Sequence, residues 1–145
     1  MGENIFANIK SEQIVLPLTV LNSYADSFNK TFTDKLVFEI KKRMEDSKDA
    51  DPWTGMLAMV PKEQEEKDLV TRAYIVAPGL NNYKLLVLKL QYKVSEVYPC
   101  HIESMLEDVK VDCNNAEEVQ RALDSIFNAD TFQRPVKMLL SQLLQ

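Results

Sequence analysis

The chain has 145 residues, of which 46% are hydrophobic and 27% charged, and this length and composition indicate one globular domain spanning residues 1–145. Its formal net charge of −5 makes it an acidic protein that repels phosphate backbones, so we expect no nucleic-acid partner. No run approaches the roughly 20 apolar residues that cross a bilayer, and the first residues lack the apolar stretch of a signal peptide. We therefore expect a cytoplasmic location and no membrane partner.

The first predicted element is a helix over about 17–31. Pro17 suits a first helical turn, where its missing N–H costs no hydrogen bond. Apolar residues then recur at three- and four-residue steps and form one stripe, which consists of Leu18, Leu21, Ala25, Phe28 and Phe32. Such a stripe predicts that the helix packs one side against a core.

The middle of the chain predicts four or five strands. The segment KLVFEIKKRM alternates apolar and polar residues, as a half-buried strand does. The further strand candidates are WTGMLAMVP, LVTRAYIVA, NNYKLLVLKLQY and VYPCHIES. Pro99 cannot donate to a ladder, so we expect the last of them at an edge or a bulge. The connections are short, which favours an antiparallel meander.

Two helices are predicted at the end of the chain. Asn115 is the expected N-cap of the first, because Glu118 three residues later completes a capping-box arrangement. Pro135 should lie near the start of the second, since a proline deeper in a helix removes a hydrogen bond. The predicted fold is therefore α+β: an antiparallel meander sheet of four or five strands, with one N-terminal and two C-terminal helices packed mainly on one face.

The segment NNYKLLVLKLQY at 81–92 carries apolar residues in both of its alternating sets. Read as a regular strand, it has one set with Leu86, Leu88, Leu90 and Tyr92 and another with Tyr83, Leu85 and Val87. The helices suffice to cover one face, so we expect the second face to be an apolar patch. A second copy in a homodimer, or another protein, should cover it; the alternative is that the chain covers itself. The residues predicted for this interface are Trp53, Tyr83, Leu85 and Val87.

The residue patterns that mark common catalytic and metal sites are missing from the sequence. The one histidine, His101, follows Cys100, but adjacent residues of a strand point to opposite faces and cannot share a proton. The three glycines are too far apart for a phosphate-binding loop. The acidic loop at 46–51 lacks the spacing, glycine and distal glutamate of a calcium loop. We therefore predict no catalytic residue, no metal and no cofactor.

These observations favour a non-enzymatic cytosolic protein that acts through protein–protein association, such as an adaptor, a regulator, or a chaperone-like or immunity-like protein. The acidic C-terminal helices offer a second contact surface for a basic partner. The alternative is a carrier of a small apolar ligand, with a pocket between the first helix and the sheet that is formed by Phe28, Phe32, Leu88 and Leu90. A third reading is an enzyme without a recognisable motif, working through a lone carboxylate and a tyrosine.

Overall fold

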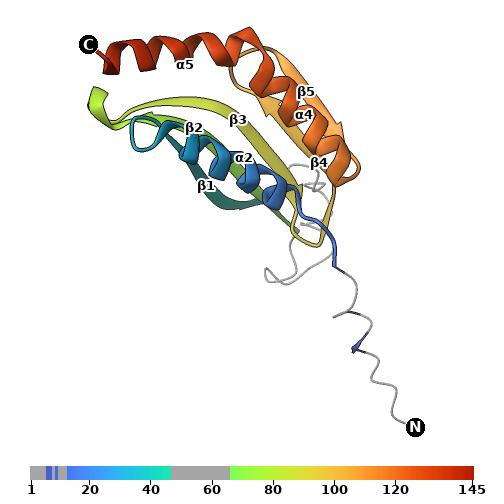
Figure 1. Ribbon diagram of the computed structural model, residues 1–145. Coiled ribbons are helices and arrows are strands. Elements are labelled where there is room, and N and C mark those ends of the chain that lie inside the picture. Colours follow the sequence, from blue (N-terminus) through green and yellow to red (C-terminus); the bar gives the residue numbers. More distant parts are fainter. Residues whose placement is uncertain (1–5, 8, 10–12, 47–65) are drawn as a thin grey trace.

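The computed structural model describes residues 6, 7, 9, 13–46 and 66–145, and these form an α+β fold (Figure 1). The strand predicted in WTGMLAMVP, with Trp53, lies outside the described residues. In chain order the main elements are α2 (Pro17–Phe32), β1 (Val37–Asp46), β2 (Lys67–Ala77), the short 3₁₀ turn η2 (Pro78–Leu80), β3 (Tyr83–Lys93), β4 (Glu96–Ser104), β5 (Val109–Cys113), α4 (Ala116–Asn128) and α5 (Asp130–Leu143).

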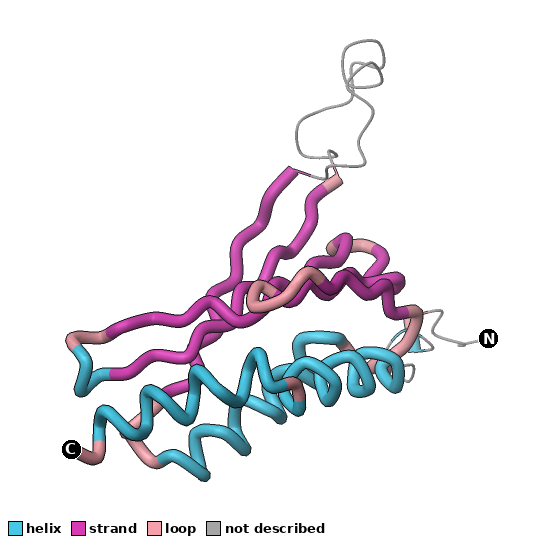
Figure 2. Tube along the Cα trace, turned by 90° about the horizontal axis from the view of Figure 1, so that it is seen from above, coloured by secondary structure: helices cyan, strands magenta, loops and turns pink. Residues whose placement is uncertain are grey.

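The five strands form one antiparallel sheet in the order β1-β2-β3-β4-β5, so each strand pairs with its neighbour in sequence. The helices lie on one side of this sheet, as Figure 2 shows. The predicted fold class is therefore confirmed. Strand β5 was not predicted, although Val109, Val111 and Cys113 alternate with polar residues there. Its five residues are too short a run for a periodicity argument.

The first helix is joined to both of its neighbours by polar contacts as well as by packing. Pro17 begins α2, as expected, and is buried. The Asn29 Oδ1 accepts a hydrogen bond of 2.8 Å from the backbone N–H of Phe38 on β1. On the other side, the Tyr24 hydroxyl donates to the carboxylate of Asp124 on α4. Burial, followed by this hydrogen bond to a carboxylate, raises the pKa of Tyr24 above its ordinary value.

The C-terminal helices confirm one sequence prediction and correct another. Asn115 is the N-cap of α4, and its side chain accepts a 2.9 Å hydrogen bond from the backbone N–H of Glu118. Helix α5, however, begins at Asp130, and Pro135 lies inside it rather than at its start. A proline at this position cannot donate to the carbonyl of Thr131, which therefore lacks its intrahelical partner. The burial of Val136 and other apolar residues beyond it compensates for the missing bond.

Strand β3 contains a bulge that changes which side chains face the helices. Ala73 on β2 lies opposite Leu88, but Ile75, two residues further along β2, lies opposite Leu85. Strand β3 therefore has one extra residue between these two pairs. Leu88 and Leu85 consequently point to the same side of the sheet, where Leu88 belongs to the core cluster under the helices and Leu85 packs against it. Val87, the neighbour of Leu88 in the bulge, is fully buried.

The expected regular alternation of β3 is thus wrong at this point. Tyr83 pairs with Ala77 and lies on the same side as Leu85, which is the helix side. Leu86 faces the opposite side, next to Tyr74. Because one inserted residue inverts the alternation, Tyr83, Leu85 and Val87 do not form an apolar patch on the outer face of the sheet.

The outer face of the sheet carries charged side chains in pairs of opposite sign. The Glu39 carboxylate lies 3.2 Å from the Lys84 ammonium and 3.4 Å from that of Lys41. The same two ammonium groups lie 5.7 Å (Lys41) and 5.9 Å (Lys84) from the centre of the Tyr74 ring. Burial works in the opposite direction, but the hydrogen bonds with Lys84 and Lys41 lower the pKa of Glu39. This part of the outer face is a charged surface open to water.

Replacing Asn115 with alanine should lower the free energy of unfolding by about 1 kcal/mol, because the N–H of Glu118 loses its acceptor. Urea denaturation followed by circular dichroism measures this difference. Asn114→Ala, at the preceding exposed position, is the matched control, and Asn115→Asp should keep the cap. Equal stability of the Asn115→Ala and Asn114→Ala variants would contradict the capping role.

Candidate functional site

Strand β3 pairs with β2 over a longer stretch than with β4, and this leaves part of one edge of β3 open. Strand β4 ends at Ser104, which pairs with Leu88 of β3. The last backbone hydrogen bond at this point joins the Met105 N–H to the Val87 carbonyl, at 2.8 Å. Residues 83–86 of β3 therefore pair with β2 alone among the described strands. Their other edge, about 13 Å long, presents backbone groups that can still accept and donate hydrogen bonds.

An apolar groove runs beside this open edge, between β3 and α5. Two adjoining cavities of about 340 and 460 Å³ share Pro135 and Met138 as common walls. The first extends towards the strand edge and is further lined by Leu80, Tyr83, Leu85, Leu139 and Gln142. The second extends towards the β4–β5 turn and is further lined by Leu106, Asp130, Thr131 and Arg134. Together they form a groove along the length of α5.

The side chains of the groove divide into a buried floor and exposed walls. Leu139 is buried and Leu85 half-buried, and both pack with the core. Tyr83 and Met138, in contrast, are 51% and 53% exposed and face the groove from the strand and the helix. Large side chains that are half-exposed on both walls of a groove are typical of a surface that binds another apolar group.

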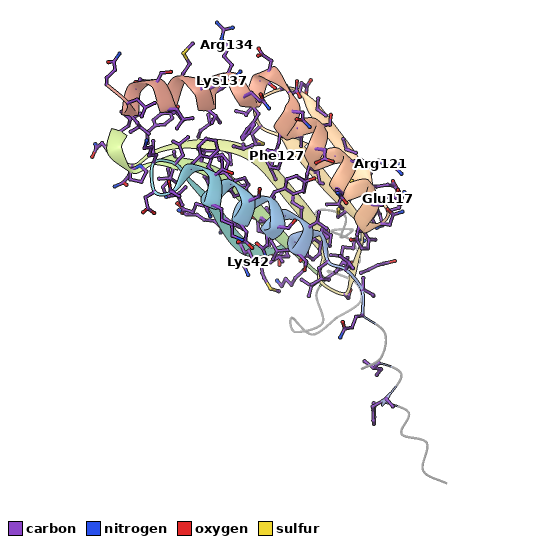
Figure 3. All side chains as sticks on the ribbon, viewed as in Figure 1. Lys42, Glu117, Arg121, Phe127, Arg134 and Lys137 are labelled. Carbon is purple, nitrogen blue, oxygen red and sulfur yellow. The ribbon has the colours of Figure 1, made fainter. Side chains whose placement is uncertain are left out.

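The end of the groove that is most distant from the strand edge is polar. Asp130 and Arg134 line it there, at the start of α5. Figure 3 shows Arg134 and Lys137 pointing away from the sheet, on the outer side of α5. Next to the strand edge, the described residues of α5 that line the groove are all uncharged, and they are Pro135, Met138, Leu139 and Gln142.

The structure divides the residues predicted for an interface. Tyr83 and Leu85 both line the groove, although they reach it on the helix side of the sheet and not on the outer face. Val87 is fully buried in the core. Trp53 lies outside the described residues. Pro135 and Met138 were not predicted from the sequence as lining residues of a groove. The one indication of this role was that a proline and a methionine lie on the exposed side of a predicted helix.

A smaller cavity of about 210 Å³, separate from the groove, lies between α2 and the junction of helices α4 and α5, where several aromatic rings meet. Phe28 and Phe32, which were predicted to line a ligand pocket, do line it, and their ring centres are 4.4 Å apart. Leu88 and Leu90, predicted for the same pocket, are instead fully buried in the core. The other lining residues are Tyr24, Ser27, Thr31, Phe38, Phe127 and Phe132.

The cysteine and histidine side chains, which could support catalysis, lie next to residues of the neighbouring strand β5. Cys100 faces Cys113 across β4 and β5, and both thiols are free and buried. His101 points to the opposite face, where its Nδ1 lies 2.6 Å from the Asp112 carboxylate. The histidine and cysteine side chains diverge, as expected. Within the described ranges, no group of three or more histidine, cysteine or acidic residues is placed to hold a metal ion.

Comparisons with protein-family models, with curated proteins and with solved structures find no match for this chain. None of the described helices is long and apolar enough to cross a membrane. Any functional conclusion therefore depends on the geometry of the groove and the cavities.

The two thiols should be unreactive in the folded protein. Burial raises the pKa of Cys100 to about 12, with Cys113 as the next contribution, and burial also raises the pKa of Cys113. Alkylation by iodoacetamide at about pH 8 should therefore be at least about a hundredfold slower in buffer than in urea, because the thiolate is the reacting species. Mass spectrometry of timed samples measures the two rates. Equally fast alkylation of the native protein would contradict the buried placement.

Proposed function

We propose that this chain is a non-enzymatic protein-binding module that holds an extended segment of a partner protein along the open edge of β3. The observation that carries the proposal is the coincidence of an unpaired strand edge at 83–86 with an apolar groove beside it. An added strand would satisfy the free backbone groups while its side chains fill the groove, which is how β-augmentation gives both affinity and specificity.

The chemistry of the two faces at this edge specifies the segment that would bind. On the helix side, Tyr83, Leu85 and Met138 would contact apolar side chains at alternate positions. On the outer side, Lys84 is the one charged residue of the open segment 83–86, and its ammonium lies 3.2 Å from the Glu39 carboxylate of β1. An acidic side chain of the bound segment next to Lys84 would share this positive charge. The expected segment therefore alternates apolar and acidic residues. It would lie beyond the end of β4 and run parallel to β4, antiparallel to β3.

Selection from a displayed library of random peptides on the full chain tests this proposal. Selected peptides should show the apolar–acidic alternation, and hydrogen exchange of the bound complex should show new protection of the amides at 83–86. Met138→Glu, at a half-exposed position, should weaken binding of the synthesised peptides by about tenfold or more, because it places a charge in the groove. Leu85→Lys is a second groove variant.

Met44→Glu is the matched control, since Met44 on β1 is 56% exposed and lies outside the groove. Its affinity for the peptides should equal that of the wild type. Peptides that protect other amides, or that bind the Met138→Glu variant equally well, would contradict the proposal. So would a concentration-dependent dimer, seen by analytical ultracentrifugation, that protects 83–86 by itself, because a second copy would then occupy the edge.

A second candidate function, the carriage of a small apolar ligand, is supported by the cavity beneath α2. Rings from α2, β1 and the α4–α5 junction surround it, with centre-to-centre distances of 5.8 Å for Phe38–Phe127 and 5.0 Å for Phe127–Phe132. Dry cavities with aromatic and aliphatic walls can bind a single ring such as benzene. The size of about 210 Å³ limits the ligand to one ring.

Toluene, as the probe for this cavity, should raise the midpoint of thermal unfolding of the wild type. It should have no effect on Phe28→Trp, in which a larger ring fills the space that Phe28 now lines. Differential scanning fluorimetry measures both. The Met138→Glu variant, altered only in the groove, should respond to toluene like the wild type. An equal response of Phe28→Trp would exclude ligand binding in this cavity.

A further inference from the structure

A polar cavity of about 390 Å³ lies at the opposite end of β3 from the open edge. The end of β3 and the starts of β2 and β4 meet there, and Lys93 lies opposite Asp68 across β2 and β3. The pairing of Gln91 with His101 places those two side chains on the outer face of the sheet. Among the described residues, neither the groove nor the aromatic cavity shares a lining residue with this site.

Asp68 is the distinctive group of this cavity. Its residue surface is only 5% exposed, although acidic residues are seldom buried without a partner. The Oδ2 atom accepts a 2.6 Å hydrogen bond from the side-chain amide of Gln91. The Oδ1 atom is buried and has no hydrogen-bond partner in the part of the chain that the structure describes. A buried carboxylate with one oxygen unpaired is costly, and a cation bound in the adjoining cavity would offset its negative charge.

The other polar groups of the cavity are mainly acceptors. Glu96 contributes a second carboxylate. The Nδ1 of His101 lies 2.6 Å from a carboxylate oxygen of Asp112, and this contact occupies Nδ1 and leaves Nε2 as the ring nitrogen that a ligand can meet. The positive charge of Lys93 is already shared with Glu66, at 3.8 Å. Among the described lining residues, acceptors thus exceed donors, which favours a ligand that donates several hydrogen bonds and carries positive charge.

Apolar surface lines the remaining wall. Tyr98 and Pro99 of β4 border the cavity, and the Tyr98 hydroxyl already donates to the Val15 carbonyl at 2.7 Å. The ring and the proline therefore offer carbon surface to a ligand, on which an alkyl chain or a planar guanidinium can pack.

We propose that this cavity binds an organic cation, an ammonium or guanidinium group on a short alkyl chain, with the Asp68 and Glu96 carboxylates as its anionic partners. The cation has two sources with the same chemistry: a free amine, or a lysine or arginine side chain of another protein. The inference is independent of the proposed strand-binding groove, because it rests on different residues at the other end of β3.

Agmatine, which carries both cationic groups on one alkyl chain, is the probe, and n-butanol is its uncharged control. Agmatine should shift the side-chain amide resonance of Gln91 in ¹⁵N-correlated spectra, and n-butanol should not. Asp68→Asn should weaken agmatine binding by at least about tenfold, because it removes the charge and replaces one acceptor by a donor. Glu96→Gln, at an exposed position, is a second variant that should weaken binding without disturbing the fold.

Asp108→Asn, which changes an exposed acidic residue outside the cavity, is the matched control and should bind agmatine like the wild type. The blocked peptide acetyl-Gly-Arg-Gly-amide separates the two sources: binding of this peptide points to a protein side chain, and binding of agmatine alone points to a free amine. Unchanged affinity in both Asp68→Asn and Glu96→Gln would overturn the proposal. So would equal binding of n-butanol, or the absence of any shift at Gln91 with agmatine.

Discussion

The fold depends on one extra residue in β3. Without the bulge at Val87, the strand could direct only half of its apolar side chains to the helices, and Tyr83 and Leu85 would lie among the charges of the outer face. With it, Leu88 and Leu90 in one half of the strand and Leu85 in the other all pack on the helix side, while Lys84 and Leu86 turn outward. The bulge thus separates an apolar inner layer from a charged outer layer along an 11-residue strand.

The open edge arises because neighbouring strands differ in length. Strands β2 and β3 have 11 residues each, whereas β4 has nine and β5 five, so β4 ends before it reaches the start of β3. The outer edge of the sheet, at β1, carries the cationic run Lys41, Lys42 and Arg43, which is a common protection against unwanted pairing. Residues 83–86 have a single lysine and a groove beside them. The edge at β1 is therefore guarded by charge, whereas the open part of β3 is suited to pairing.

Helix α5 packs on the core through Phe132, Val136 and Leu139, and its last turn lies against the η2 turn. Leu143 approaches η2 so closely that a Cβ on Gly79 would lie 2.6 Å from its Cδ2 atom, so a larger residue at this turn would require the leucine side chain to shift. Pro135 interrupts the backbone hydrogen bonds in the first half of the helix. The groove, the aromatic cavity and the polar cavity differ in chemistry, since they suit an extended polypeptide, a single apolar ring and an organic cation respectively.

The order and type of most elements could be read from the sequence, because they depend on local interactions. Pro17 and Asn115 mark helix starts through backbone geometry and capping, and the period-two pattern of β1 and β2 comes from residues that are close in the chain. The α+β class and the placement of the helices on one face follow from these elements and their short connections. The divergence of Cys100 and His101 was predictable for the same reason, since it requires only the alternation of a strand.

The sites were decided by tertiary structure. A bulge is set by the pairing of β3 with β2, not by the sequence of β3, so the faces of Tyr83 and Leu85 could not be read from their spacing. The open edge arises because β4 ends before it reaches the start of β3. The Asp68 Oδ1 atom is unpaired because no donor among the described residues lies close enough to it in the folded chain. Local periodicity fixes the elements because neighbouring residues interact whatever the rest of the chain does. Grooves and unsatisfied polar groups depend on what distant segments leave uncovered, and only the assembled fold determines that.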